Sequence, residues 1–141
     1  MILTLLDQNL LAIIAKNGFP YIATGATTGS QYVANKAFNK LTLAVATYNP
    51  GGCFADARFT AKMPGTYKVD LVGMTFGGNH GGQSVVKNGT TAVLGTDDRF
   101  GGVLSGTVPL LAGEYLEFYA SAYATNSYFS IGSFTINRIG L

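Results

Sequence analysis

The segment Leu111–Tyr123, LAGEYLEFYASAY, has the alternating pattern of a β-strand. Successive side chains of a strand point to opposite faces of its sheet. One face would carry Leu116, Phe118, Ala120 and Ala122, which is typical of a strand packed on a core. The residues of the other face would be Tyr115, Glu117, Tyr119, Ser121 and Tyr123. Three tyrosines are more aromatic surface than a solvated face normally has, so we expect this face to be covered as well.

Short strand-like segments follow one another from Gly25 onward. They are rich in Thr, Val, Tyr and Phe, and turn residues separate them, among them the Asn88–Gly89 pair of a two-residue hairpin. The segments are 41–48, 53–61, 65–76, 84–87, 91–94, 102–109, 115–124 and 128–139. Because no long amphipathic helix interrupts them, the pattern predicts an all-β, antiparallel sandwich or barrel of the jelly-roll kind.

The N-terminal segment Met1–Phe19 differs from the rest of the chain. Its apolar residues recur at helical spacing, and Asn17–Gly18 would end such a helix, although an extended arm suits the same residues. The residues available for docking are Leu3, Leu6, Leu10, Ile13, Ile14 and Phe19. We therefore predict an apolar arm over residues 1–24 and a jelly-roll domain over residues 25–141. Such an arm has to be buried against its own domain, a neighbouring subunit or a larger particle.

The composition favours a chain that is covered by partners. Nine basic and seven acidic residues give a net charge of +2, and charged residues make up 11% of the chain, against about 25% in ordinary soluble domains. The charges are scattered singly, which argues against a nucleic-acid or polybasic membrane surface. No apolar segment is long enough to span a bilayer, and no signal peptide is clear. We therefore expect a chain that is complete from Met1 and made in the cytoplasm.

Few residues suit catalysis or metal binding. The chain has one cysteine, Cys53, and one histidine, His80, and it has no G-x-S-x-G motif. Asp97-Asp98-Arg99 is the densest charge group, and it suits a solvated turn or an inter-subunit salt bridge better than a calcium site, because adjacent strand residues point apart. We predict that the protein is not an enzyme and binds no cofactor or metal.

Four motifs, in order, resemble the C1q/TNF-like jelly-roll family. They are FTAKMPGTY (59–67), VKNG (86–89), LAGEYL (111–116) and NSYFSIGSFTI (126–136), and together they span about residues 54–139. The resemblance implies a ten-strand jelly roll that assembles as a homotrimer, with aromatic residues of the 115–124 strand at the threefold axis. The residues that this places in the trimer interface are Tyr115, Tyr119, Tyr123 and Phe129. The tyrosine face has two alternative roles. Another segment of the same chain would cover it, or it would serve as a platform that binds carbohydrate.

Within this family the chain is most similar to bacteriophage jelly rolls. It has no collagen-like stalk and no secretion signal, and the apolar arm is foreign to secreted members, so a cytokine-like ligand is disfavoured. The resemblance implies a capsid decoration (cement) protein on the virion exterior, made in the host cytoplasm, which clamps the major capsid protein. The alternative is the receptor- or glycan-binding tip of a tail fibre or spike. Its candidate recognition residues are Asn79, His80, Asp97, Asp98 and Arg99.

Overall fold

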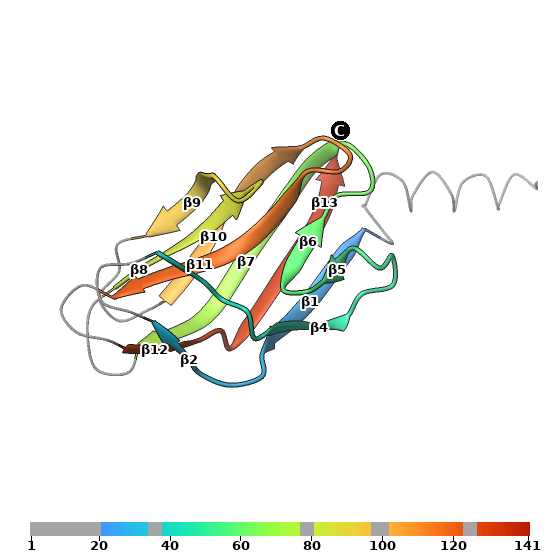
Figure 1. Cartoon of the computed structure of the whole chain (residues 1–141). Helices are drawn as coiled ribbons and strands as arrows, with labels where there is room; N and C mark the ends of the chain where they lie inside the picture. The colour runs from blue at the N-terminus through green and yellow to red at the C-terminus, as the bar shows by residue number, and fades with distance from the viewer. Residues whose placement is uncertain (1–20, 34–37, 77–80, 97–101, 123–126) are drawn as a thin grey trace, which may run out of the picture.

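The computed structural model describes residues 21–33, 38–76, 81–96, 102–122 and 127–141. These residues form strands and no helix (Figure 1). The strands are β1 (Ile22–Thr27), β2 (Gln31–Val33), β3 (Asn39–Lys40), β4 (Ala44–Tyr48), β5 (Phe54–Ala55), β6 (Arg58–Thr60), β7 (Gly65–Phe76), β8 (Gly81–Lys87), β9 (Thr91–Thr96), β10 (Gly102–Leu110), β11 (Tyr115–Ala122), β12 (Ser127–Ser130) and β13 (Ser133–Gly140). The prediction of an all-β fold is confirmed.

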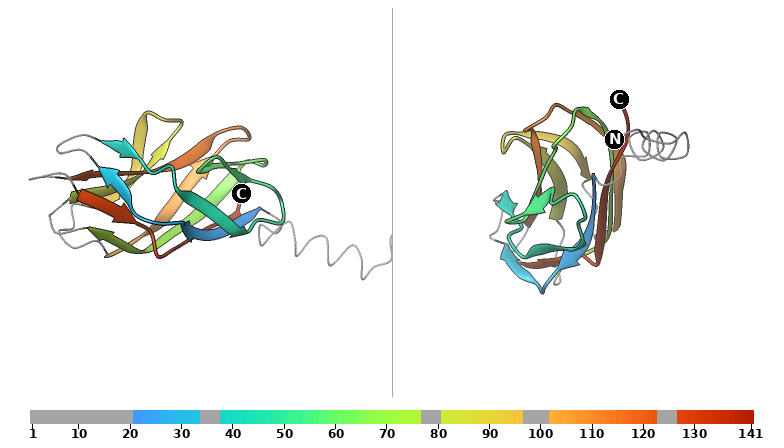
Figure 2. Two further views of the ribbon diagram at one scale, coloured as in Figure 1. Left: turned by 60° about the horizontal axis from the view of Figure 1, so that its bottom comes forward. Right: turned by 90° about the vertical axis from the view of Figure 1, so that its right-hand side faces the viewer.

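The strands form two antiparallel sheets. The seven-stranded sheet has the order β2-β12-β7-β13-β1-β4, with β10 paired to β7 on the side away from β13. The six-stranded sheet has the order β5-β6-β11-β8-β9, with β3 paired to the far end of β11. The views in Figure 2 show the two sheets enclosing a shared interior. This arrangement is the predicted jelly-roll sandwich.

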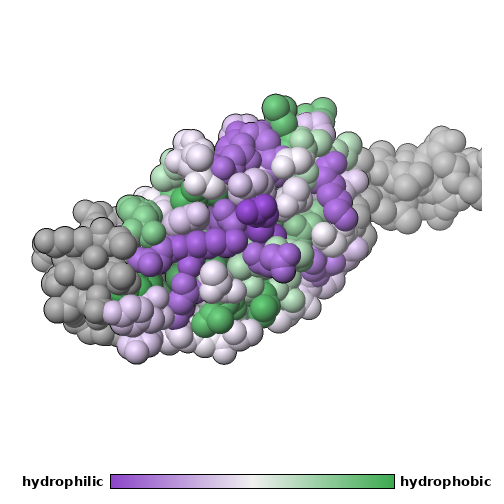
Figure 3. Space-filling view, in the orientation of Figure 1, coloured by the Kyte–Doolittle hydropathy of each residue, from purple (hydrophilic) through white to green (hydrophobic). Residues whose placement is uncertain are grey.

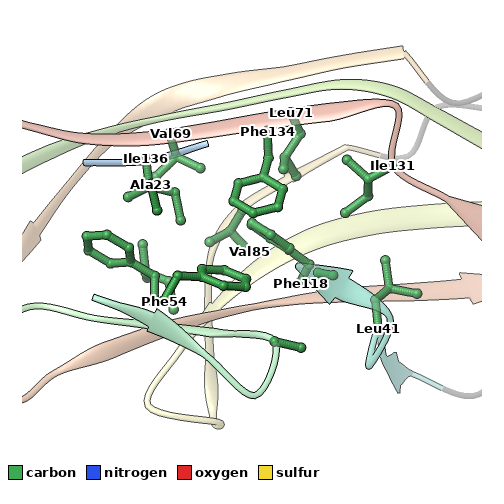
Figure 4. Close-up of a cluster of buried hydrophobic side chains, with 14 of the residues drawn as sticks. Ala23, Leu41, Phe54, Val69, Leu71, Val85, Phe118, Ile131, Phe134 and Ile136 are labelled. Carbon is green, nitrogen blue, oxygen red and sulfur yellow. The ribbon is translucent and has the colours of Figure 1, made fainter. Parts of the chain in front are cut away.

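Aromatic rings from both sheets meet in the core. Phe118 of β11 points toward Phe134 of β13, with ring centroids 5.1 Å apart, and Phe54 stacks on Phe134 at 4.9 Å (Figure 4). Phe129 of β12 is also fully buried among core residues of the single chain. Its role in a trimer interface stays a prediction, and the single chain already buries the whole ring.

Several element bounds agree with the sequence pattern, and two predicted strands are each divided into two. The Gly65–Phe76 strand has the predicted bounds, and Asn88 and Gly89 adopt positive φ of 54° and 72°, as a two-residue hairpin requires. The predicted strand 53–61 is a tight hairpin of β5 and β6, because Asp56 and Ala57 both adopt positive φ. The predicted strand 128–139 is divided between β12 and β13.

The predicted boundary between arm and domain falls inside a strand. β1 begins at Ile22 and lies between β13 and β4, where Ala23 pairs with Ile136 and is fully buried. Sequence pattern missed this strand because its residues IATGAT are small and carry little apolar signal. The jelly roll therefore includes residues that were predicted to belong to the arm, and residues 1–20 lie outside the described part of the chain.

Candidate functional site

The tyrosine-rich side of β11 forms the outward face of the six-stranded sheet. Leu116 and Phe118 are buried on the inner side, as predicted, whereas Tyr115 and Tyr119 are half-buried on the outer side. Tyr123 lies outside the described residues. A role for Tyr115 and Tyr119 in a subunit interface stays a prediction.

Glu117, between these tyrosines, is the centre of a charged cluster. Only 3% of its surface is exposed, and its Oε2 accepts hydrogen bonds from Nε and Nη2 of Arg58, both at 3.2 Å. Lys40 Nζ lies 2.5 Å from the same oxygen. A carboxylate so buried requires such partners, because an unpaired buried charge is costly. The Arg58 guanidinium also lies 3.7 Å from the centroid of the Tyr115 ring, so part of the tyrosine face is covered within the chain.

A hollow of about 270 Å³ lies beside this cluster. Its lining residues are Phe38, Val86, Gly89, Thr90, Ala92 and Tyr119. Figure 3 shows this side of the molecule, where a band of hydrophilic side chains crosses the surface with separate hydrophobic patches beside it. Tyr119 of β11 and Phe38, which precedes β3, thus place two aromatic rings beside the β8–β9 hairpin, next to a paired carboxylate.

A larger cleft of about 400 Å³ lies elsewhere, and its polar groups already have partners. Its lining residues are Pro64, Gly65, Thr66, Lys87, Pro109, Leu110, Leu111, Glu114 and Leu141. The backbone N–H of Leu111 donates to Glu114 at 2.7 Å, and Lys87 and Asn88 also bind this carboxylate, so the pKa of Glu114 is lowered. These contacts hold a turn together, and they leave no group there that requires a ligand.

Two further groups have shifted pKa values for structural reasons. Burial raises the pKa of the Cys53 thiol, which is the behaviour of a small core residue. Burial also raises the pKa of Tyr67, whose hydroxyl donates to the Met63 carbonyl at 2.6 Å. Neither group lines the hollow described above.

The outward face of the seven-stranded sheet carries most of the exposed apolar side chains. Ten large hydrophobic side chains are exposed in the described part of the chain, and seven of them alternate with core residues of this sheet. The seven are Tyr32, Val45, Tyr48, Val72, Val103, Tyr128 and Ile139. Tyr32 and Tyr128 form an edge-to-face pair with centroids 5.7 Å apart. The sequence motifs directed attention to β11 and so missed this face.

The other predicted site residues belong to segments outside the described ranges. Asn79, His80, Asp97, Asp98 and Arg99 lie outside the described residues, as do the six residues of the arm. Within the described ranges, no group of three or more His, Cys, Asp or Glu side chains is arranged to hold a metal ion. None of the described residues forms a helix with the length and apolarity of a membrane span.

Phe38, Lys40 and Arg58 are the site residues that sequence analysis missed. Each is a single residue in a short or irregular segment, and each reaches the hollow or its carboxylate only through the pairing of β3 and β6 with β11. The only signal in the sequence was that Glu117 would need a charged partner on a neighbouring strand. Finding that partner requires the register in which the neighbouring strands pair with β11.

Comparisons with known proteins agree on the fold. No protein-family model matches the sequence, and no curated protein matches it. Among solved structures, the globular domain of zebrafish complement 1qA is similar, with a TM-score of 0.60 and 14% identity over 84% of this chain and 96% of that one. Eiger TNF from S. frugiperda has a TM-score of 0.54 and 9% identity, over 83% and 92% of the two chains. Murine APRIL has a TM-score of 0.54 and 10% identity, over 81% and 96%. This chain therefore has a C1q/TNF-like jelly-roll fold, and at these identities the likeness establishes the fold alone.

Proposed function

We propose that this chain is a structural protein without enzymatic activity, that it assembles as a homotrimer, and that the trimer decorates a viral capsid. The observation that carries the proposal is the outward face of the seven-stranded sheet. A monomer would leave seven large hydrophobic side chains of one face in water, and apolar surface gathered on one face marks an interaction site.

The composition of that face suits contact between copies. Its few charges include Lys68 and Asp70, whose charged atoms are 4.0 Å apart, and the hydroxyl of Ser105 donates to Asp70 at 2.5 Å. Valines and tyrosines with small polar residues between them resemble the centre of a protein interface, from which charge is depleted. We place the subunit contact here and not on β11, where Tyr115 already packs against Arg58.

The decoration role rests on the apolar arm and on the low charge of the chain. Leu3, Leu6 and Leu10 would dock on the major capsid protein or cross to a neighbouring subunit. Three arms on one trimer would bind with avidity, so that individually weak contacts hold on a shell of many identical sites. The proposed location is the exterior of the virion.

Co-sedimentation with undecorated shells of the virus that encodes the chain tests this role. We expect the full chain to pellet with the shells. A chain lacking residues 1–19 should remain in the supernatant although it still forms a trimer. Equal pelleting of both chains would contradict docking by the arm. Failure of the full chain to pellet would contradict decoration.

A further inference from the structure

The hollow between Phe38 and Tyr119 has the features of a small-ligand site. Phe38 is 63% exposed although it is a large apolar residue, and Tyr119 is half-buried on the same face. Val86 and Ala92 line the same hollow with apolar side chains. From this geometry we infer that the hollow binds a neutral pyranose sugar, an inference that does not depend on the trimer or on the capsid.

Glu117 does not line the hollow, but one of its oxygens lies close to Gly89, which does. Arg58 and Lys40 both contact its Oε2, and none of the described residues donates a hydrogen bond to its Oε1. Oε1 faces the hairpin, since it would lie 3.9 Å from a β-carbon placed on Gly89, which lines the hollow. A carboxylate that is 97% buried thus keeps one oxygen free as an acceptor next to the hollow.

The charge around this oxygen determines which donor it accepts. Glu117 carries one negative charge, and Lys40 and Arg58 carry two positive charges, so the cluster has an excess of positive charge. A cationic ligand would be repelled by the two side chains that already pair with the carboxylate. A hydroxyl group donates a hydrogen bond without adding charge, so a neutral hydroxylated ligand fits.

A pyranose ring combines the two features that the hollow requires. Its C–H face is apolar and packs on an aromatic ring, and its edge carries hydroxyl donors, one of which would have to pass Gly89 to pair with Oε1 of Glu117. The volume of about 270 Å³ is below the roughly 300–1,000 Å³ of pockets for drug-sized ligands. The site therefore suits one ring, and we expect millimolar affinity for a free monosaccharide.

NMR titration of the full chain with glucose, galactose and mannose tests the inference. At least one of the three sugars should shift the amide signals of Gly89, Thr90 and Tyr119 at millimolar concentration. Glucosamine, which differs from glucose by one charged amine, should bind more weakly than glucose. Absence of shifts with all three neutral sugars, or shifts only at other residues, would overturn the inference.

Two substitutions test whether the rings of Tyr119 and Phe38 bind the sugar. Tyr119→Ala and Phe38→Ala should each weaken binding at least about tenfold, whereas Leu111→Ala, at an exposed residue outside the hollow, should leave it unchanged. Phe38 is exposed, so its variant keeps the inference testable even if Tyr119→Ala fails to fold. Unchanged affinity in the folded Phe38→Ala chain would overturn the assignment, and the native mass of each variant separates this outcome from any failure of the trimer.

Discussion

A chain carrying both Val72→Asp and Val103→Asp is expected to be a monomer under conditions in which the unaltered chain is a trimer. Val72 and Val103 are 46% and 65% exposed and lie on neighbouring strands of the outward face of the seven-stranded sheet. In the assembly that we propose, each new carboxylate would be buried without a partner, which costs several kcal/mol per ion. We expect the dissociation constant to rise at least about 100-fold. Light scattering on a size-exclusion column measures the change.

Leu111→Asp is the matched control for this variant. Leu111 is 67% exposed, but it lies in the turn before β11 and not on the outward face of the seven-stranded sheet. Its variant should keep the trimer, and the double variant should keep the far-ultraviolet circular dichroism of the unaltered chain, because exposed positions tolerate charge. A double variant that stays trimeric would exclude this face as the interface.

Gly25→Ala is expected to destabilise the jelly roll more than any ordinary surface change. A β-carbon at Gly25 would collide with the carbonyl oxygen of Val45 and would lie 2.8 Å from Cζ of Phe134. The carbonyl is backbone and the ring is packed in the core, so neither can move aside without disturbing the pairing of β1 with β4. We expect the free energy of unfolding to fall by about 3 kcal/mol and the Tm by roughly 10 °C.

Gly29→Ala provides the comparison for this loss of stability. A β-carbon at Gly29 meets no atom within 4 Å, so this variant should unfold at nearly the same urea concentration as the unaltered chain. Urea unfolding followed by circular dichroism measures both variants. Equal stability of the Gly25→Ala and Gly29→Ala chains would show that β1 is not held between β4 and β13 as described.

Strand faces and turns were predictable because they depend on local pattern. The alternation in β11 correctly placed Leu116 and Phe118 in the core, and the Asn88–Gly89 pair correctly placed the β8–β9 turn. Both signals lie within a few residues of sequence. β1 was missed because its burial comes from its neighbours β4 and β13 and not from its own apolar residues.

The candidate sites were less predictable because they depend on which strands become neighbours. Phe38 and Tyr119 are 81 positions apart in the chain and face one hollow only through the pairing of β3 with β11. The exposed face of the seven-stranded sheet likewise gathers single valines and tyrosines from strands that are distant in sequence. The residues of each site were visible in the sequence, whereas their proximity required the fold.

The native mass of the unaltered chain in dilute solution tests the central claim most directly. Light scattering during size-exclusion chromatography, repeated over a series of dilutions, gives this mass without a label. The proposed assembly predicts three times the mass of the 14.8-kDa chain, retained on dilution. A chain that stays monomeric at every concentration would contradict the claim that the outward face of the seven-stranded sheet joins copies of this protein.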